Sequence, residues 1–197
     1  MHRHNHYEAA FEAYLRQQHL GYIAVDETRR SLLDDQPVKS LDFIVYGTPE
    51  VRLLVDIKGR RFPAQVRGKS RHVWQNWSTR EDISGLTRWL ERVGPGYRAL
   101  LVFLYQISPE VQLQAETPDL FAFRERLYLL RAIDVLDYEQ HMRSRSPRWD
   151  TVCLPQRAFR MLVQPFSEFL LPRFAEASDW DEPYGQCFAD DVELKFV

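Results

Sequence analysis

Hydrophobic residues recur at helical spacing close to the start of the chain. The segment 6–19 (HYEAAFEAYLRQQH) carries them every three or four positions, the period of a helix with one buried side. These positions are Tyr7, Phe11, Tyr14 and Leu15. Asn5 is a suitable N-cap and Gly21 is a stop signal, so the pattern predicts a helix between them.

Three runs rich in β-forming residues follow this helix. Residues 22–26 (YIAVD) indicate a short strand, and the segment from there to Pro37 is typical of a loop. Residues 40–47 (SLDFIVYG) and 51–59 (VRLLVDIKG) are separated by a short turn that contains Pro49. Two such runs joined by a short turn predict a β-hairpin.

A second helix and a buried strand are predicted in the middle of the chain. Residues 80–93 have a helical pattern, Thr79 can cap the helix, and Glu81 and Asp82 lie in the first turn, where the helix dipole favours acids. Residues 98–107 (RALLVFLYQI) are almost continuously apolar, which is typical of a strand buried on both faces. A strand, a crossover helix and a second buried strand imply parallel pairing at the centre of a sheet.

The remaining segments complete an α/β fold. Residues 59–79 are rich in Arg, Gly and Ser and indicate irregular structure, whereas 123–135 alternates like a strand. Residues 134–143 and 155–171 have helical patterns. The order of elements predicts an α/β sandwich with a mixed central β-sheet flanked by helices.

Composition indicates a globular protein and excludes several classes. The 197 residues are 45% hydrophobic and 13% aromatic, which is enough to bury a core and excludes disorder as the main state. No stretch approaches the roughly 20 apolar residues of a membrane span, and the N-terminus lacks the apolar segment of a secretory signal. Cys153 and Cys187 are too few for a disulfide framework. We therefore expect a cytoplasmic protein with reduced thiols and no membrane partner.

Charge is distributed unevenly around a formal net charge of −2. Residues 51–100 contain eleven Lys and Arg against four acids, whereas residues 174–197 contain one Lys against seven acids. A local basic field can steer an anionic ligand even when the whole protein is nearly neutral. We expect an α/β core over residues 1–143 and a mostly helical C-terminal extension with an acidic tail over 144–197, packed on that core.

Two aspartates interrupt the predicted hairpin strands. Asp42 lies inside an apolar strand, where a carboxylate is costly unless a partner satisfies it. Asp56 follows three large aliphatic residues, and strand alternation places it on the same face as Lys58. If the strands pair, Asp42 and Asp56 come together and would repel each other unless a divalent cation lies between them. Mg²⁺ suits such a site because it takes one or two carboxylates and retains waters, and Lys58 could then orient or deprotonate a water.

Glu8 and Glu12 are candidates for a third acid. They are four residues apart and share one side of the first helix, flanking its apolar positions. Either could point over the sheet edge toward the two aspartates. A solvated helix flank is the alternative interpretation for each of them.

A basic segment with aromatic residues follows Lys58. Gly59 could allow a polyanion to approach the backbone closely. The basic residues after it are Arg60, Arg61, Arg67, Lys69 and Arg71, and Trp74 and Trp77 follow them. Basic residues interleaved with aromatics suit a nucleic-acid backbone and unstacked bases. A solvated basic loop and tryptophans that pack in the core are the alternatives.

These motifs resemble the PD-(D/E)XK nuclease superfamily, which includes restriction endonucleases and archaeal Holliday-junction resolvases. The matching segments are HYEAAFE (6–12), SLD (40–42) and DIK (56–58). The helix–strand pair that follows is also similar to resolvase-like members. The resemblance covers roughly residues 6–135, and Leu41 stands where the proline before the first Asp is usual.

This resemblance implies a restriction-endonuclease-like fold and Mg²⁺-dependent hydrolysis of DNA phosphodiester bonds, with Mn²⁺ as a substitute metal. It implies that Asp42, Asp56 and the carbonyl of Ile57 hold the metal, that Lys58 serves the attacking water, and that Glu8 or Glu12 completes the site. Glu8 is the preferred third ligand.

Two other hypotheses remain open at this point. The chain could be an inactive protein of nuclease fold that binds nucleic acid or serves as a scaffold, because a fold does not guarantee an activity. Its large aromatic content could also reflect a homodimer interface, which is compatible with nuclease activity.

Overall fold

The computed structural model describes residues 5–25, 31–33, 36–48, 51–66 and 69–172. Arg67 and the acidic segment 174–197 lie outside the described residues. In the described part of the chain, no helix is long and apolar enough to cross a membrane.

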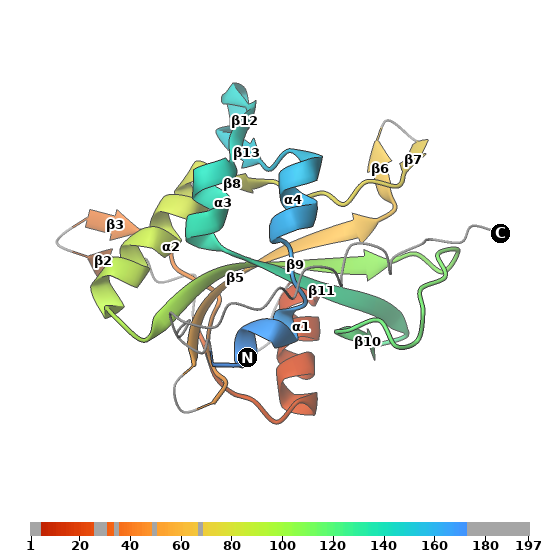
Figure 1. Cartoon of the computed structure of the whole chain (residues 1–197), viewed down its shortest axis with the longest axis horizontal. Helices are drawn as coiled ribbons and strands as arrows, with labels where there is room; N and C mark the ends of the chain where they lie inside the picture. The colour runs from red at the N-terminus through yellow and green to blue at the C-terminus, as the bar shows by residue number, and fades with distance from the viewer. Residues whose placement is uncertain (1–4, 26–30, 34–35, 49–50, 67–68, 173–197) are drawn as a thin grey trace, which may run out of the picture.

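A six-stranded mixed sheet forms the centre of the molecule (Figure 1). Its strands, in spatial order, are β1 (Gly21–Ala24), β4 (Phe43–Tyr46), β5 (Arg52–Phe62), β9 (Tyr97–Ile107), β11 (Arg126–Asp134) and β10 (Leu120–Phe123). β4 and β5 pair in antiparallel fashion, whereas β5 and β9 are parallel. The predicted hairpin, the parallel central pair and the mixed α/β architecture are therefore confirmed.

Helices and smaller sheets surround this central sheet. The helices are α1 (His6–Gln17), α2 (Arg80–Val93), α3 (Val135–His141) and α4 (Gln156–Leu162), with 3-10 segments η1 (Pro147–Trp149) and η2 (Phe166–Leu170). A three-stranded sheet contains β12 (Arg143–Ser146), β13 (Thr151–Cys153) and β8 (Ser78–Thr79). Two separate hairpins are β2 (Ser31–Leu33) with β3 (Gln36–Val38), and β6 (Ala64–Val66) with β7 (Lys69–Arg71).

Each face of the central sheet has its own hydrophobic core. α1 and η2 cover one face, where Phe11 and Val55 belong to one buried cluster. α2, α3 and α4 cover the other face, where Leu54, Ile83 and Phe159 belong to a second cluster (Figure 1). Because side chains alternate along a strand, β5 contributes to both cores in turn.

β9 is the buried axis of the sheet. All residues from 99 to 105 are fully buried, and β5 and β11 flank the strand along its length. A strand enclosed on both faces needs apolar residues at every position, which is the pattern that its sequence predicts.

Two parts of the fold differ from the sequence predictions. β5 extends to Phe62, and the region 59–79 contains three short strands rather than irregular structure alone. β10 forms a hairpin with β11 that the pattern does not reveal, because its turn uses Arg124 and Glu125 at positive φ where Gly or Asn is usual.

The C-terminal region also differs from a mostly helical extension. Residues 143–153 form β12 and β13 around η1, and α4 ends at Leu162. Phe166 and Phe169 of η2 belong to the same buried hydrophobic cluster as Phe11 of α1. Asp119 links η2 to α1. Its carboxylate accepts hydrogen bonds from the Tyr14 hydroxyl of α1 at 2.7 Å and from the backbone N–H of Ser167 in η2 at 2.9 Å.

Gly59 is a point of close contact between β5 and α1. The Tyr7 ring occupies the space beside it, so that a Cβ at residue 59 would overlap the ring. The glycine therefore serves helix packing in this structure, and its surroundings are not open for a polyanion as the sequence analysis expected.

Replacing Gly59 with Ala should therefore destabilise the fold by about 1–3 kcal/mol, the usual cost of overpacking. Urea denaturation would measure this loss. Gly21→Ala is a matched control, because a Cβ there meets Tyr46 at an ordinary 3.6 Å. If the clash with Tyr7 is the cause, Tyr7→Ala should relieve much of it, and strictly additive losses in the double variant would contradict this explanation.

Candidate functional site

The candidate site begins where β4 and β5 separate. Asp42 directly precedes β4, and its buried carboxylate Oδ2 accepts a hydrogen bond from the backbone N–H of Ile57 at 2.5 Å. The regular pairing of the two strands extends only to Phe43 and Val55. The Asp42 side chain thus satisfies a β5 backbone donor just beyond the end of the ladder, which explains how an aspartate is tolerated there.

Asp56 and Lys58 lie on the face of β5 that α2 covers. Asp56 is only 4% exposed, and its Oδ2 lies 2.5 Å from the Lys58 ammonium nitrogen. This contact is a buried ion pair. Their placement on one face agrees with strand alternation.

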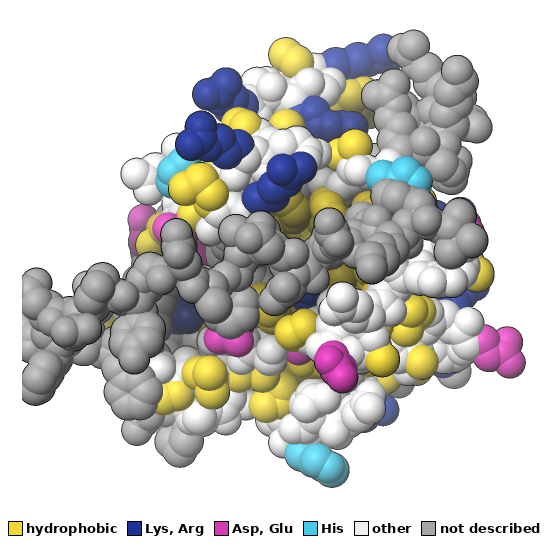
Figure 2. Space-filling model, turned by 45° about the vertical axis from the view of Figure 1, so that its right-hand side comes forward, with side chains coloured by type: hydrophobic (Ala, Val, Ile, Leu, Met, Phe, Trp, Pro, Cys, Tyr) yellow, Lys and Arg dark blue, Asp and Glu magenta, His cyan; other side chains and the backbone are white. Residues whose placement is uncertain are grey.

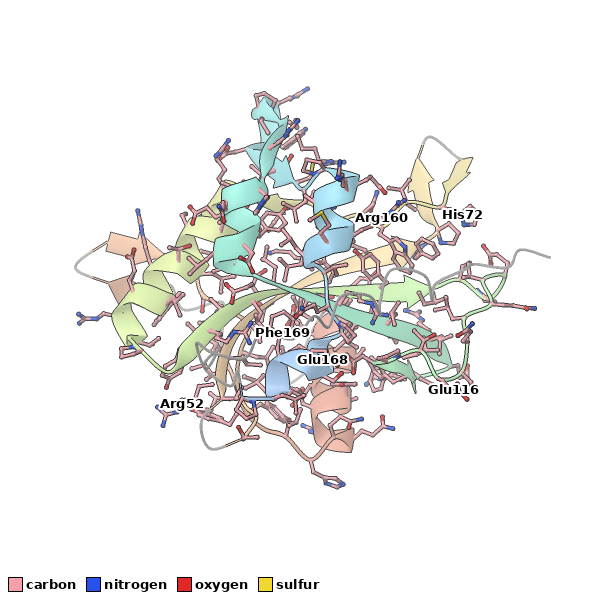
Figure 3. All side chains as sticks on the ribbon, in the orientation of Figure 1. Arg52, His72, Glu116, Arg160, Glu168 and Phe169 are labelled. Carbon is pink, nitrogen blue, oxygen red and sulfur yellow. The ribbon has the colours of Figure 1, made fainter. Side chains whose placement is uncertain are left out.

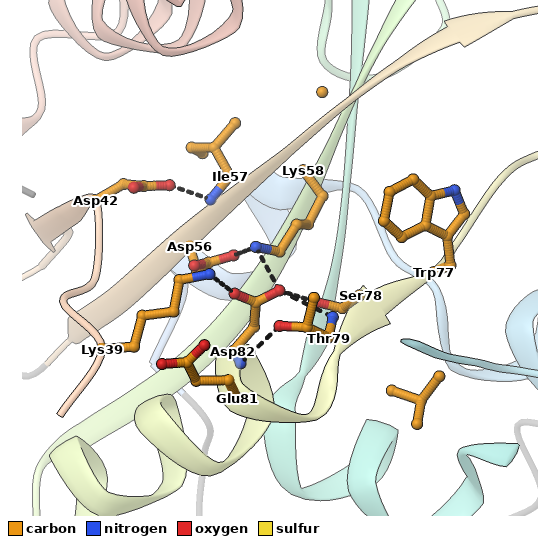
Figure 4. Close-up of polar contacts among 12 residues, drawn as sticks. Lys39, Asp42, Asp56, Ile57, Lys58, Trp77, Ser78, Thr79, Glu81 and Asp82 are labelled. Carbon is orange, nitrogen blue, oxygen red and sulfur yellow. Dashed lines mark hydrogen bonds and ion pairs between the residues drawn. The ribbon is translucent and has the colours of Figure 1, made fainter. Parts of the chain in front are cut away.

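Asp82 is a third acid in this cluster, and the sequence analysis did not assign it to the site. It is buried at the start of α2, where it forms a reciprocal capping box with Thr79. Its Oδ2 lies 2.9 Å from the Lys58 ammonium and also accepts a hydrogen bond from the Ser78 hydroxyl at 2.7 Å. The Lys39 ammonium contacts its Oδ1, so that Figure 4 shows Asp82 between two lysines.

A sequence signal for Asp82 does exist. Thr79 and Asp82 have the three-residue spacing of a capping box ahead of an apolar run. That signal marks a helix start and gives no information on the distant Lys58, so it does not by itself indicate chemistry.

The charges of the cluster influence one another strongly. Burial alone would lower the pKa of Lys58, but the carboxylates of Asp56 and Asp82 outweigh burial and raise it above its usual value. Burial likewise opposes ionisation of Asp82, yet Lys58, Lys39 and the Thr79 backbone N–H hold its pKa below the usual range. For Asp56, burial dominates and raises the pKa of the carboxyl despite the contact with Lys58.

These charges define what Lys58 can do chemically. An ammonium that contacts two carboxylates remains protonated and donates hydrogen bonds. Of the two roles that the sequence analysis left open, orientation of a water or phosphate fits this arrangement better than deprotonation of a water.

The two candidate glutamates, Glu8 and Glu12, belong to α1. α1 packs on the face of β5 that carries Val55 and Ile57, opposite to Asp56 and Lys58. Glu12 accepts hydrogen bonds from Arg16 at 2.6 Å and from the Tyr22 hydroxyl at 2.8 Å. Glu8 is half-buried on the same helix.

Of the predicted basic residues, the structure describes the side chains of Arg60 and Arg61. Arg60 is largely buried; its guanidinium lies 3.9 Å from the Trp77 ring centroid and donates a hydrogen bond to the Trp77 carbonyl. Arg61 is exposed. Lys69 and Arg71 belong to the β6–β7 hairpin, and Arg67 lies outside the described residues.

Trp74 has a packing role, as the alternative interpretation expected. Its ring stacks on Phe62 with 3.7 Å between the centroids and meets Tyr105 edge-on. Trp74 is half-buried and contributes to the packing around β5 and β9.

The donor set of the site suits a small hard cation. Within the described residues, no group of three or more Asp, Glu, His or Cys side chains is arranged to hold a metal ion. Asp42 and Asp56 remain as two carboxylates at the strand fork, and the Ile57 carbonyl directly follows Asp56 in the chain. Mg²⁺ is commonly held by one or two carboxylates together with waters and substrate phosphates, so this chemistry fits it.

Comparisons with known proteins give distant structural likenesses alone. No family model and no curated protein matches the sequence. Among solved structures, the chain is similar to Hjc, a Holliday junction resolvase of Archaeoglobus fulgidus, with 11% identity and a TM-score of 0.49. The match covers 84% of this chain and 98% of that protein. A likeness at this level does not identify the fold or the activity of this chain.

Replacing Asp82 with Asn should reveal how much the cluster depends on this carboxylate. The change leaves Lys58 with one anionic partner, and we expect it to cost about 1–3 kcal/mol of stability. Urea denaturation at neutral pH would measure the loss. Glu81→Gln is the matched control, since this exposed acid occupies the same helical turn and contributes only about 0.3–1 kcal/mol through the helix dipole. Equal losses in both variants would contradict the central role of Asp82.

Proposed function

We propose that this chain is a Mg²⁺-dependent nuclease of the restriction-endonuclease-like type that hydrolyses DNA phosphodiester bonds. The observation that carries the proposal is the buried cluster of Asp42, Asp56 and Lys58 at the fork of β4 and β5, together with Asp82. Clusters of buried charged groups with shifted pKa values are candidates for functional sites, because their burial costs stability and a function is a reason to retain them.

Each residue of the cluster would have a distinct role in the reaction. Asp42, Asp56 and the Ile57 carbonyl would hold the metal, which would neutralise charge on the scissile phosphate and lower the pKa of the attacking water. Lys58 would donate hydrogen bonds to the water or to a phosphate oxygen. Asp82 would position Lys58, because it is fixed in the capping box and contacts the ammonium from the side of α2.

The assignment of Asp82 changes the expected make-up of the site. Glu8 or Glu12 of α1 stays the proposed third metal ligand, with Glu8 preferred, and α1 packs on the opposite face of β5. Asp82 supplies a third carboxylate on the same face as Lys58. We therefore propose Asp82 as the supporting acid and keep Mn²⁺ as the expected substitute metal.

Binding of Mg²⁺ should appear as a gain in thermal stability. A ligand that binds only the folded state adds about 2.7 kcal/mol at one hundred times its dissociation constant. We expect Mg²⁺ to raise the midpoint temperature of the parent chain in calorimetry, and Asp56→Asn to remove this shift. Glu116→Gln should retain it, since Glu116 is exposed and lies at the β10 end of the molecule (Figure 3). An undiminished shift in Asp56→Asn would place the metal elsewhere.

The activity itself should depend on Asp56. Loss of a metal ligand costs several kcal/mol of transition-state stabilisation, which corresponds to at least about a thousandfold in rate. A cleavage assay with linear duplex, single strand, four-way junction and supercoiled plasmid would test Asp56→Asn against the parent chain in Mg²⁺ or Mn²⁺.

The fold should survive this substitution. Burial disfavours the charged form of Asp56, and Lys58 retains Asp82 as a partner, so Asn should cost less stability than Asp82→Asn does. Glu116→Gln again serves as the control and should cleave at the parent rate. If the parent binds DNA but cleaves none of the substrates with either metal, the chain is a binding protein and not a nuclease.

A further inference from the structure

A basic hairpin projects from the C-terminal part of the fold. β12, η1 and β13 form this hairpin, which lies at the top of Figure 1. Its exposed side chains include Arg143, Arg145, Arg148 and Trp149. Figure 2 shows Lys and Arg side chains gathered at this upper end of the molecule.

The hairpin and the helix α4 that follows it are strongly basic. Residues 143–163 contain five arginines and one acid, Asp150. Asp150 is already paired with Arg80 at 3.3 Å. Arg157 and Arg160 of α4 are exposed as well, and Figure 3 shows Arg160 on that helix. A surface of this kind is complementary to the phosphates of a nucleic acid.

Trp149 adds an aromatic surface to the hairpin. It is 68% exposed, an unusual state for a tryptophan, and the Arg148 guanidinium lies 5.3 Å from its ring centroid. An exposed ring beside arginines can stack on an unpaired base, whereas the bases of a duplex are already stacked on each other. These features therefore favour a single strand over a duplex.

The base of the hairpin is rigidly attached to the body. The buried Asn76 side chain donates a hydrogen bond to the Leu154 carbonyl at 3.2 Å and accepts one from the Leu154 N–H at 3.1 Å. The Tyr138 hydroxyl donates to the Asn76 carbonyl at 2.7 Å. The hairpin can thus hold a bound strand in a fixed position.

The hairpin is also continuous with the candidate site. β13 pairs with β8, where Thr151 lies opposite Thr79, the capping partner of Asp82. Arg145 lies 5.0 Å from the ring centroid of Trp77, the same ring that Arg60 stacks on. A strand bound along the hairpin would therefore lie next to the Asp82 end of the site.

We propose that the hairpin of residues 143–150 binds single-stranded nucleic acid, with Arg143 and Arg148 contacting phosphates and Trp149 stacking on a base. This proposal rests on the proposed nuclease function in one respect: the single strand bound by the hairpin would be the substrate of the neighbouring site. Binding itself requires neither metal nor cleavage, so the two ideas can fail separately.

The test is fluorescence anisotropy in EDTA with the full chain and a labelled oligothymidylate of about 20 nucleotides. We expect Trp149→Ala to weaken binding about 5- to 150-fold, and Trp149→Phe to retain most of the affinity because it keeps an aromatic face. A duplex of equal length should be affected much less by Trp149→Ala.

The phosphate contacts have a separate signature in salt. The double variant Arg143→Gln/Arg148→Gln should reduce the slope of log affinity against log salt by about 1.4, because each contact with a single strand contributes about 0.7. Arg88→Gln/Arg92→Gln is the matched control, since it removes two exposed arginines from α2 and should leave the slope unchanged.

Three results would overturn the proposal: no binding of the oligothymidylate by the parent chain at low salt, parent-like affinity and slope in the hairpin variants, or a loss confined to duplex. If the hairpin variants bind normally while Asp56→Asn loses cleavage, the nuclease proposal stands alone. If the hairpin variants lose binding and the parent never cleaves, the hairpin proposal stands alone.

Discussion

The contact of Lys58 with Asp56 and Asp82 is the interaction on which the candidate site depends. All three groups are largely removed from water, and each would be costly to bury alone. Lys39 adds a second ammonium from the partly exposed side, so the cluster with Asp42 contains three carboxylates and two ammonium groups. Within the described residues, the opposite charges of Lys58, Asp56 and Asp82 compensate for one another's burial.

The position of this cluster follows from the central parallel pair. α2 is the crossover between β5 and β9, so its first turn must return to the sheet face that carries Asp56 and Lys58. The capping box then fixes the Asp82 carboxylate within that turn. The apolar side chains on both faces of β9 provide the rigid support, because close-packed cores permit little movement of the strands they hold.

The main elements were predictable wherever hydrophobic periodicity is strong. α1, the β4–β5 hairpin, α2 and β9 have such patterns, and the structure confirms them. The β10 turn and the hairpin of β12 and β13 were missed for a physical reason. The former lacks Gly or Asn at its positive-φ residues, and the latter has the polar sequence RSRS, without an alternating apolar face.

The arrangement of the candidate residues was predictable where strand alternation or the β4–β5 hairpin brings them together. Asp56 and Lys58 are two residues apart on one strand, so alternation alone brings them together. Asp82 reaches Lys58 through tertiary packing of the crossover helix, and local sequence contains no measure of that distance. The residue types on α1 likewise contain no information on which sheet face the helix covers, so the choice between Glu8 and Glu12 stays a prediction.

The same reasoning explains why the C-terminal segment matters for a site built mainly from earlier residues. β8 contains Ser78 and Thr79, which donate hydrogen bonds to the Asp82 carboxylate. β8 also pairs with β13. The segment that orients the acid of the site is therefore also the one that anchors the basic hairpin. Hydrolysis of a polymer requires that the chosen phosphate be held in register with the reacting groups. The proposed binding surface meets this requirement, because its strand β13 pairs directly with β8 beside the site.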